Sequence, residues 1–299
     1  MAQLLVIVVA FAVTAALMPL LIRISLRLGC TDKPGPLKVH AAPVPVFGGI
    51  GIFAGVVAAL ALDAGAGAAK VAAVLAIALA LVVLGTADDL LGLSPRARLA
   101  AQLLVAVATM AAGLKVGTFP LLAAMPLTVV LVVGAINAVN LFDGLDGLAG
   151  GTVAVSLVGF AALLHLSGKS EYVLLALAVL GALVGFLLFN FNPARIFMGD
   201  NGSTFLGYVL AVLAMNVAAR PWDLRSLAVA LLLIGLPIVD TAVAIGRRAL
   251  EGRPIFLGDR SHIYDQLVDH GFSVRQTAFI CYGIQAALVS GSVWLAAYP

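Results

Sequence analysis

A polar stretch at positions 137–151, reading NAVNLFDGLDGLAGG, lies between long apolar runs that carry almost no charge. Asn137, Asn140, Asp143 and Asp146 recur every three residues, so on a helix they would form one narrow, slowly drifting stripe of oxygen-bearing groups. A carboxylate within a membrane-spanning segment costs on the order of 2.5 to 3.5 kcal/mol. These aspartates therefore need a cation, a polar partner or water, unless the stretch is a helix–turn connection with incidental polar residues.

Two adjacent aspartates, Asp88 and Asp89, occur in GTADDLLGLSPRAR at the predicted C-terminal end of a helix. That position is unfavourable, because the helix dipole is negative there and neighbouring carboxylates repel each other. Arg96 and Arg98 follow a predicted turn and would compensate the charge structurally. A metal-bound diphosphate would compensate it functionally.

A third acidic position, Asp200 in FMGDNGS, marks the predicted start of another helix. Asp is a common N-cap, and a cap and a metal ligand are compatible roles. The first N–H groups of the same helix would suit an anion. Further along the chain, Asp240 lies within an apolar run, where we expect it to pair with a partner on another helix. The polar segment 247–276 then contains the sequence GDRSH.

The composition predicts a polytopic membrane protein, with 63% hydrophobic residues, 10% charged residues and a mean hydropathy of 1.16. A 20-residue helix rises about 30 Å, the hydrocarbon thickness of a bilayer. We predict an all-α protein with about ten transmembrane helices in a single domain, residues 1–299. The candidate spans lie between Met1 and Arg23, His40 and Asp63, Lys70 and Asp88, Arg98 and Lys115, Lys115 and Asp143, Asp146 and His165, Glu171 and Arg195, Asp200 and Arg220, Arg225 and Arg247, and Arg275 and Pro299.

The basic residues predict the orientation of these spans. If all ten cross, the loops on the side of Arg23 hold twelve Lys and Arg residues and the opposite loops hold five. The positive-inside rule then places the Arg23 side in the cytoplasm and both termini outside. Most acidic residues fall on the cytoplasmic side too, which that rule does not require. We therefore expect an active site on the cytoplasmic face of the inner (plasma) membrane.

The side chains gathered on that face are carboxylates, amides, arginines and a histidine. Hard oxygen ligands favour Mg²⁺, with Mn²⁺ as an alternative, and Mg²⁺ takes only one or two protein carboxylates beside water and phosphates. The chemistry indicated is phosphoryl transfer, which depends on positioning and charge neutralisation. No nucleic-acid-binding pattern is present, and Cys30 and Cys281 lie too far apart in the sequence to support a metal cluster or a disulfide.

Five motifs in this order resemble the polyprenyl-phosphate N-acetylhexosamine-1-phosphate transferases, relatives of the phospho-muramoyl-pentapeptide transferase. They are DKPGPLKVHAAPVPVFGG, GTADDLLGLSPRAR, NAVNLFDGLDGLAGG, FNFNPARIFMGDNGS and GDRSHIYD, and they cover nearly the whole chain. The resemblance implies transfer of a sugar 1-phosphate from a UDP-sugar to a membrane polyprenyl phosphate, with release of UMP. The product would begin a lipid-linked glycan of the cell envelope.

The resemblance also implies roles for individual residues. Asn140 and Asp200 match magnesium ligands, and Asp88 and Asp89 match an aspartate pair required for catalysis. That pair either deprotonates the acceptor, orients the lipid phosphate or supports the magnesium site. The remaining expected substrate-binding residues are Asp146, which matches a position that reads uracil, the adjacent Asp143, Arg98 at a diphosphate-binding position, and Lys38, Asn190, Arg260 and His262.

The chain departs from the family in its last motif. Many GlcNAc-specific bacterial members have HIHH there, whereas this chain has HIYD and retains only His262. GlcNAc, GalNAc and a deoxy-amino sugar therefore remain open as the sugar. The glycan pathway, the acceptor chain length and the oligomeric state, a homodimer included, also remain open.

An ion-coupled membrane transporter with an acidic site is the alternative function. Such sites usually lie near the membrane midplane at interrupted helices of an inverted repeat. Here the carboxylates cluster at predicted cytoplasmic helix ends, and no repeated pair of interrupted spans is evident in the sequence. The sequence therefore favours an enzyme.

Overall fold

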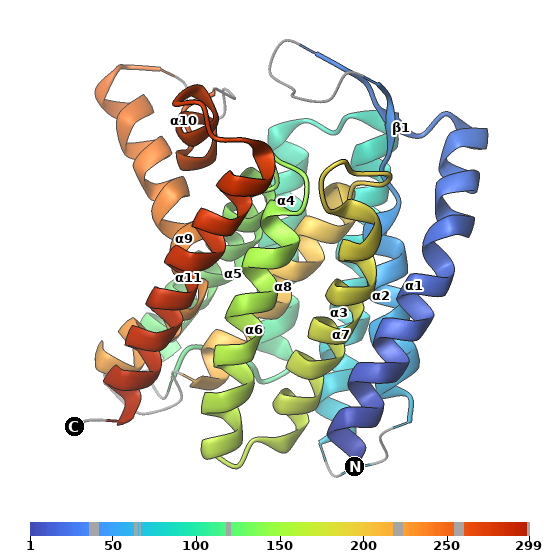
Figure 1. Ribbon diagram of the computed structural model, residues 1–299. Helices are drawn as coiled ribbons and strands as arrows, with labels where there is room; N and C mark the ends of the chain where they lie inside the picture. Colours follow the sequence, from blue (N-terminus) through green and yellow to red (C-terminus); the bar gives the residue numbers. More distant parts are fainter. Residues whose placement is uncertain are drawn as a thin grey trace.

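The computed structural model describes residues 1–35, 42–62, 65, 67–117, 121–217, 224–253 and 260–297. These residues are almost entirely helical (Figure 1), as the continuous apolar runs predict. The helices are α1 (Ala2–Leu28), α2 (Gly48–Leu60), α3 (Ala68–Leu91), α4 (Pro95–Ala111), α5 (Leu121–Phe142), α6 (Leu148–Leu166), α7 (Ser170–Asn190), α8 (Gly199–Val217), α9 (Leu224–Leu250), α10 (Ile263–Asp269) and α11 (Val274–Ala297). Two short antiparallel strands, β1 (Thr31–Asp32) and β2 (Val44–Pro45), complete the fold.

Each of the ten predicted ranges corresponds to one helix, and among the described residues seven helices are long and apolar enough to cross a membrane: α1, α3, α5, α6, α7, α9 and α11. The chain is therefore a polytopic membrane protein. Helix α2 has 13 residues and α4 has 17, shorter than a span needs. The number of crossings and their orientation stay predictions.

The chain connections sort to two ends of the helix bundle. The α3–α4, α5–α6 and α7–α8 connections lie at the same end as β1 and α10, whereas α1 begins and α11 ends at the opposite end (Figure 1). The first helix continues past the predicted boundary at Arg23 to Leu28, and Gly29 caps its C-terminus in the left-handed conformation with φ 69°. All the predicted motifs that the structure describes thus lie towards one end.

Helix α8 is buried at the centre of the bundle, where α2, α3 and α5 approach it closely. Glycines allow the approach: a Cβ atom on Gly85 of α3 would lie 2.4 Å from the backbone nitrogen of Asn201. On α2, a Cβ atom on Gly49 would lie 2.2 Å from the backbone nitrogen of Gly202. The polar first turn of α8 is therefore held against two neighbouring helices rather than facing lipid.

Helix α9 contains Pro237. Proline has no backbone N–H, so the Leu233 carbonyl does not receive its usual hydrogen bond within the helix. The side chain of Gln285 on α11 fills this gap. Its Nε2 donates to the Leu233 carbonyl (2.9 Å), and its Oε1 accepts from the Leu236 N–H (2.9 Å). A polar side chain within the bundle thus satisfies the backbone at a proline, as membrane helices require.

Candidate active site

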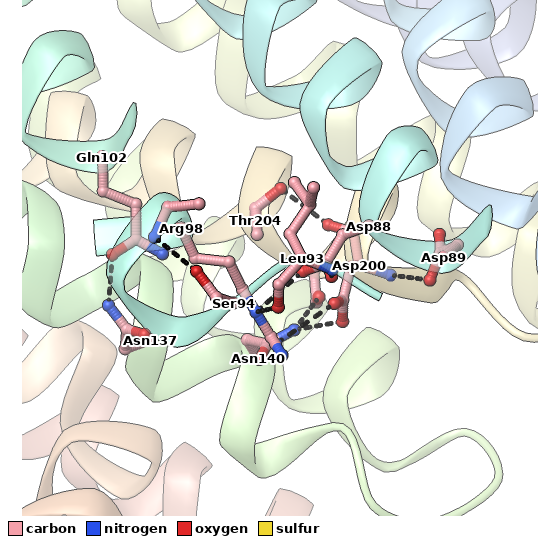
Figure 2. Close-up of polar contacts among 12 residues, drawn as sticks. Asp88, Asp89, Leu93, Ser94, Arg98, Gln102, Asn137, Asn140, Asp200 and Thr204 are labelled. Carbon is pink, nitrogen blue, oxygen red and sulfur yellow. Dashed lines mark hydrogen bonds and ion pairs between the residues drawn. The ribbon is translucent and has the colours of Figure 1, made fainter. Parts of the chain in front are cut away.

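The carboxylate of Asp89 caps the N-terminus of α8. Its Oδ1 accepts the backbone N–H of Asp200 (3.0 Å), and its Oδ2 accepts the side-chain amide of Asn201 (2.6 Å), as Figure 2 shows for the Asp200 contact. The positive end of the α8 dipole therefore faces Asp89. The alternative role of Asp200 as the N-cap does not hold, because α8 begins at Gly199 and the carboxylate that binds its N–H groups comes from α3.

Asp200 is then held from a second direction by α5. The side-chain nitrogen of Asn140 donates to Asp200 Oδ1 (2.7 Å) and to the hydroxyl of Ser203 (2.9 Å). The two residues predicted as magnesium ligands are therefore directly hydrogen bonded, although they lie 60 positions apart in the sequence. Figure 2 shows Asn140 and Asp200 facing each other between α5 and α8.

Asp88 differs from its neighbour, because it points to the α3–α4 connection. Its Oδ1 accepts the Leu93 N–H (2.7 Å), and its Oδ2 lies 3.0 Å from Nε of Arg98. Arg98 also places Nη1 3.6 Å from Asp200 Oδ2. Only 8% of Asp88 is exposed. The guanidinium of Arg98 therefore compensates the negative charge of this buried carboxylate, which is the structural role expected for it.

A pocket of about 670 Å³ opens beside this cluster; we call it the carboxylate pocket. It contains six of the predicted site residues but not Asp88, Arg98, Arg260 or His262, and Lys38 lies outside the described residues. The predicted site residues that line it are Asp89, Asn140, Asp143, Asp146, Asn190 and Asp200.

Asp143 faces the pocket from the α5–α6 connection. Burial raises the pKa of its carboxyl from 3.8 to about 8, and the charges of Asp200, Asp89 and Asp146 act in the same direction. So many carboxylates around one cavity repel each other, and a bound cation would relieve that repulsion. The electrostatics of the pocket therefore favour a positively charged ligand.

Asp146 and Asn190 hold the connection between α7 and α8. Asp146 Oδ2 accepts from the side chain of Asn192 (2.9 Å) and from the Ala194 N–H (2.9 Å). Asn190 accepts the Gly147 N–H (3.0 Å) and donates to the Ile196 carbonyl (2.9 Å). Both residues line the pocket and also hold its wall in place. Backbone groups already occupy both ends of the Asn190 side-chain amide.

The four residues do not form one helical stripe, because α5 ends at Phe142 and both Asp143 and Asp146 lie in the following connection, close to the predicted span boundaries at these two aspartates. Asn137 points away from the pocket, since its amide donates to Gln102 (2.6 Å) and to the Val133 carbonyl (2.8 Å). The three-residue spacing thus indicated neighbours in space but not a single helical face.

The last motif lies next to the pocket rather than in its lining. His262 is only 3% exposed, and its Nδ1 lies 2.6 Å from Asp240 Oδ2. The predicted pairing of Asp240 across elements is therefore confirmed. His262 stacks on Tyr264. Tyr264 in turn packs closely against Gly144 of the pocket wall, where an added Cβ atom would lie 2.4 Å from Cζ of the tyrosine. Arg260 forms ion pairs with two residues of α10: its Nε lies 3.8 Å from Asp265 Oδ1, and its Nη2 lies 3.5 Å from Asp269 Oδ1.

Three polar residues of this region were not predicted. Asp32 and Asn192 line the pocket, and Asn201 bridges Asp89 and the Val46 carbonyl (2.9 Å). Each lies within one of the five sequence motifs: Asp32 in the first, and Asn192 and Asn201 in FNFNPARIFMGDNGS. Their presence in those polar motifs is the only signal that could have pointed to them.

The donor set fits a hard divalent cation. The pocket offers carboxylate and amide oxygens and has no Cys or His among its lining residues. Among the described residues, no group of three or more His, Cys, Asp or Glu side chains is arranged to hold a metal alone. Mg²⁺ does not need such a group, because water and substrate phosphates complete its octahedron.

Comparison with known proteins identifies the family. The sequence model of glycosyl transferase family 4 matches residues 71–218, which include four of the five acidic residues of the pocket. A protein of Bacillus subtilis (strain 168) named "Probable undecaprenyl-phosphate N-acetylglucosaminyl 1-phosphate transferase" is 37% identical over 98% of this chain and 87% of its own length. The chain belongs to glycosyl transferase family 4.

Other members are more distant from this chain. Two proteins named "Undecaprenyl-phosphate alpha-N-acetylglucosaminyl 1-phosphate transferase", from Yersinia pestis and Escherichia coli (strain K12), are 30% and 28% identical. They align with 90% and 92% of this chain and over 77% and 79% of their own lengths. The resemblance drawn from the five motifs is confirmed, and membership of glycosyl transferase family 4 favours a transferase over a transporter.

Proposed function

We propose that this protein transfers a sugar 1-phosphate from a UDP-sugar to polyprenyl phosphate, releasing UMP and beginning a lipid-linked glycan of the cell envelope. The proposed sugar is an N-acetylhexosamine, with GlcNAc favoured, and the proposed acceptor is undecaprenyl phosphate. The names of the family members support both. The observation that carries the proposal is the hydrogen-bonded cluster of Asp89, Asn140 and Asp200, which lines the carboxylate pocket of this membrane protein.

Asn140 and Asp200 would hold Mg²⁺, or Mn²⁺ in its place. When bound, the ion would neutralise the diphosphate of the donor during transfer. The Asn140 amide nitrogen is already engaged by Asp200 and Ser203, which leaves the Asn140 side-chain oxygen as the donor atom. Asp89 would act through α8, by keeping the Asp200 backbone in place.

In the proposed reaction an oxygen of the acceptor phosphate attacks the phosphorus bonded to the sugar. The bond from that phosphorus to the bridging oxygen breaks, and UMP leaves with the electron pair. The second pKa of a phosphate monoester is about 6, so most acceptor is already dianionic near pH 7. A general base is therefore not required, which favours positioning roles for Asp88 and Asp89.

The remaining predicted residues are proposed to bind substrate. Arg98 stands beside Asp200 and would contact the diphosphate, and Asp143 and Asp146 would contact the uridine. Lys38, Asn190, Arg260 and His262 complete the proposed set. The pocket would face the cytoplasm from the inner (plasma) membrane, an orientation that the distribution of Lys and Arg supports.

The test is transfer of label from water to lipid. Purified protein, Mg²⁺, radiolabelled UDP-GlcNAc and undecaprenyl phosphate are mixed, and the lipid is then extracted. We expect labelled lipid with the wild type, and none after chelation of the metal or with Asp200→Asn. A panel of UDP-sugars then identifies the sugar. Label that stays in the aqueous phase with every UDP-sugar would contradict the proposal.

A further inference from the structure

A second hollow, of about 520 Å³, lies at the bundle surface between α1 and α7. We call it the α1–α7 groove. Its walls come from the C-terminal half of α1, the segment around β2 and the start of the α7–α8 connection. Its described lining includes Pro19, Arg23, Leu26, Phe189, Ala194 and Arg195. None of the described lining residues is acidic, in contrast to the carboxylate pocket.

Among the described residues of this lining, the charged ones are Arg23 and Arg195. The guanidinium of Arg195 lies 4.6 Å from the centre of the Phe189 ring and donates one bond to the Leu188 carbonyl (3.3 Å). These contacts hold one guanidinium at the groove and use only one of its five N–H donors in a hydrogen bond. Two arginines beside an apolar cavity are complementary to a phosphate group attached to an apolar chain.

The surface next to the groove is apolar and belongs to two candidate membrane spans, α1 and α7. Leu20 and Leu188, the sequence neighbours of the lining residues Pro19 and Phe189, are 50% and 58% exposed. Acyl chains would cover this surface in a bilayer. The arginines lie towards the C-terminal ends of these helices, where a lipid headgroup would be.

The groove and the carboxylate pocket share a wall formed by Ala42, Val44 and Ala194. The wall is tied down next to the groove, because the Val46 N–H donates to the Ser25 hydroxyl of α1 (3.3 Å). A phosphate beside the arginines would lie across this wall from the carboxylates, away from the reacting position. The groove therefore suits a resident lipid better than the acceptor.

We propose that the α1–α7 groove binds the phosphate headgroup of an anionic glycerophospholipid, with Arg23 and Arg195 as its ligands. The bound lipid supports the shared wall from outside. Phospholipid composition thereby affects the carboxylate pocket without the bound glycerophospholipid entering it.

Native mass spectrometry of the full-length protein tests the binding directly. Phosphatidylglycerol is titrated against phosphatidylcholine, with Arg23→Gln/Arg195→Gln compared to wild type. The matched control is Arg27→Gln/Arg96→Gln, which removes two exposed arginines that do not line the groove. We expect the groove variant to bind phosphatidylglycerol roughly tenfold more weakly and the control to bind it like wild type. Arg23→Lys/Arg195→Lys should retain part of the binding.

Equal phosphatidylglycerol binding by the groove variant and wild type would overturn the proposal. So would a groove variant that keeps phosphatidylglycerol but loses undecaprenyl phosphate, because the groove would then serve the acceptor. This measurement needs no turnover, so its failure is distinct from failure of the proposed function. In nanodiscs, wild-type activity should rise several-fold when phosphatidylglycerol is added to phosphatidylcholine, whereas the groove variant should show only its basal rate.

Discussion

Asp88 and Asp89 are adjacent in the sequence but occupy different environments. Successive residues of a helix point about 100° apart, so the two carboxylates bind different groups, although both contact Asp200. Asp89 lines the pocket and receives the N–H groups of α8, whereas Asp88 is bound to the α3–α4 connection and Arg98. The two aspartates therefore act on different parts of Asp200: Asp89 binds its backbone N–H, and Asp88 is hydrogen bonded to its side chain.

We expect Asp89→Asn to lower the transfer rate by more than about tenfold, a loss of at least ~1.4 kcal/mol of barrier lowering. The new side-chain NH₂ would face either the Asp200 N–H or the Asn201 amide, each of which donates to Asp89. The initial rate of lipid product formation at saturating substrates measures the effect.

Asp88→Asn is the control for this prediction. It keeps an acceptor for the Leu93 N–H, weakens the contact with the partly exposed Arg98 and leaves an amide that can still hydrogen bond to Asp200, so the rate should fall less. A larger loss with Asp88→Asn than with Asp89→Asn would reverse the assignment.

Substitutions of Asn140 and Asp146 should change different kinetic constants. Asn140→Ala should raise the Mg²⁺ concentration needed for half-maximal rate, since it removes a proposed ligand and the amide that positions Asp200. Asp146→Ala should raise KM for the UDP-sugar. Steady-state kinetics with Mg²⁺ and donor varied in turn separate the two effects.

Asp146→Asn provides the comparison for the second variant. It retains an oxygen that can accept the Ala194 N–H, so the pocket wall should stay closer to its place than in Asp146→Ala. The opposite pattern, with Asp146→Ala acting on Mg²⁺ and Asn140→Ala acting on the donor, would refute both assignments.

At the scale of elements, the contact of α3 with α8 decides whether the cluster forms. Gly85→Ala would place a methyl group 2.4 Å from the Asn201 backbone nitrogen and push apart the helices that Asp89 joins. We expect a loss of about 1–3 kcal/mol in stability together with a lower transfer rate. Thermal unfolding in detergent and the transfer assay measure these losses.

The control is Gly134→Ala on α5, where the added carbon would meet nothing within 4 Å. That variant should be neutral or more stable, because alanine favours a helix over glycine. If both variants behaved alike, close packing at Gly85 would not be the cause.

A second prediction at this scale concerns the proline in α9. Gln285→Leu leaves the Leu233 carbonyl and the Leu236 N–H without their side-chain partner. Each buried unsatisfied group costs about 1–3 kcal/mol, so the melting temperature should fall clearly. Ser292→Ala, which removes a single bond to the Val229 carbonyl between the same helices, should lower it less. Equal melting temperatures for the two variants would argue against this account of Gln285.

At the scale of the whole molecule, the basic end of the bundle is predicted to face the cytoplasm. Single cysteines can be introduced as Glu251→Cys at that end and Lys115→Cys at the other, after replacement of Cys30 and Cys281. Both introduced positions are exposed, whereas the native cysteines are buried. An impermeant maleimide should label Lys115→Cys in intact spheroplasts and Glu251→Cys only after lysis. The opposite labelling would invert the orientation.

Much of the architecture follows from the sequence alone. Backbone polar groups within a bilayer must be satisfied inside their own segment, so long apolar runs have to form helices. This constraint is local, which is why each predicted range contains a helix. The motifs in turn identified the family, because their residue types and order can be recognised without knowing any contact.

Only the tertiary structure decided how the polar residues are used. Helix rotation and packing turn Asp89 towards α8 and Asn137 towards Gln102. The capping of α8 by a residue 111 positions away cannot be inferred from local pattern, since it depends on the approach that Gly85 permits. The sequence indicated which residues are candidates for the chemistry, because residue type and motif order are local, whereas long-range packing decided which of them share a pocket.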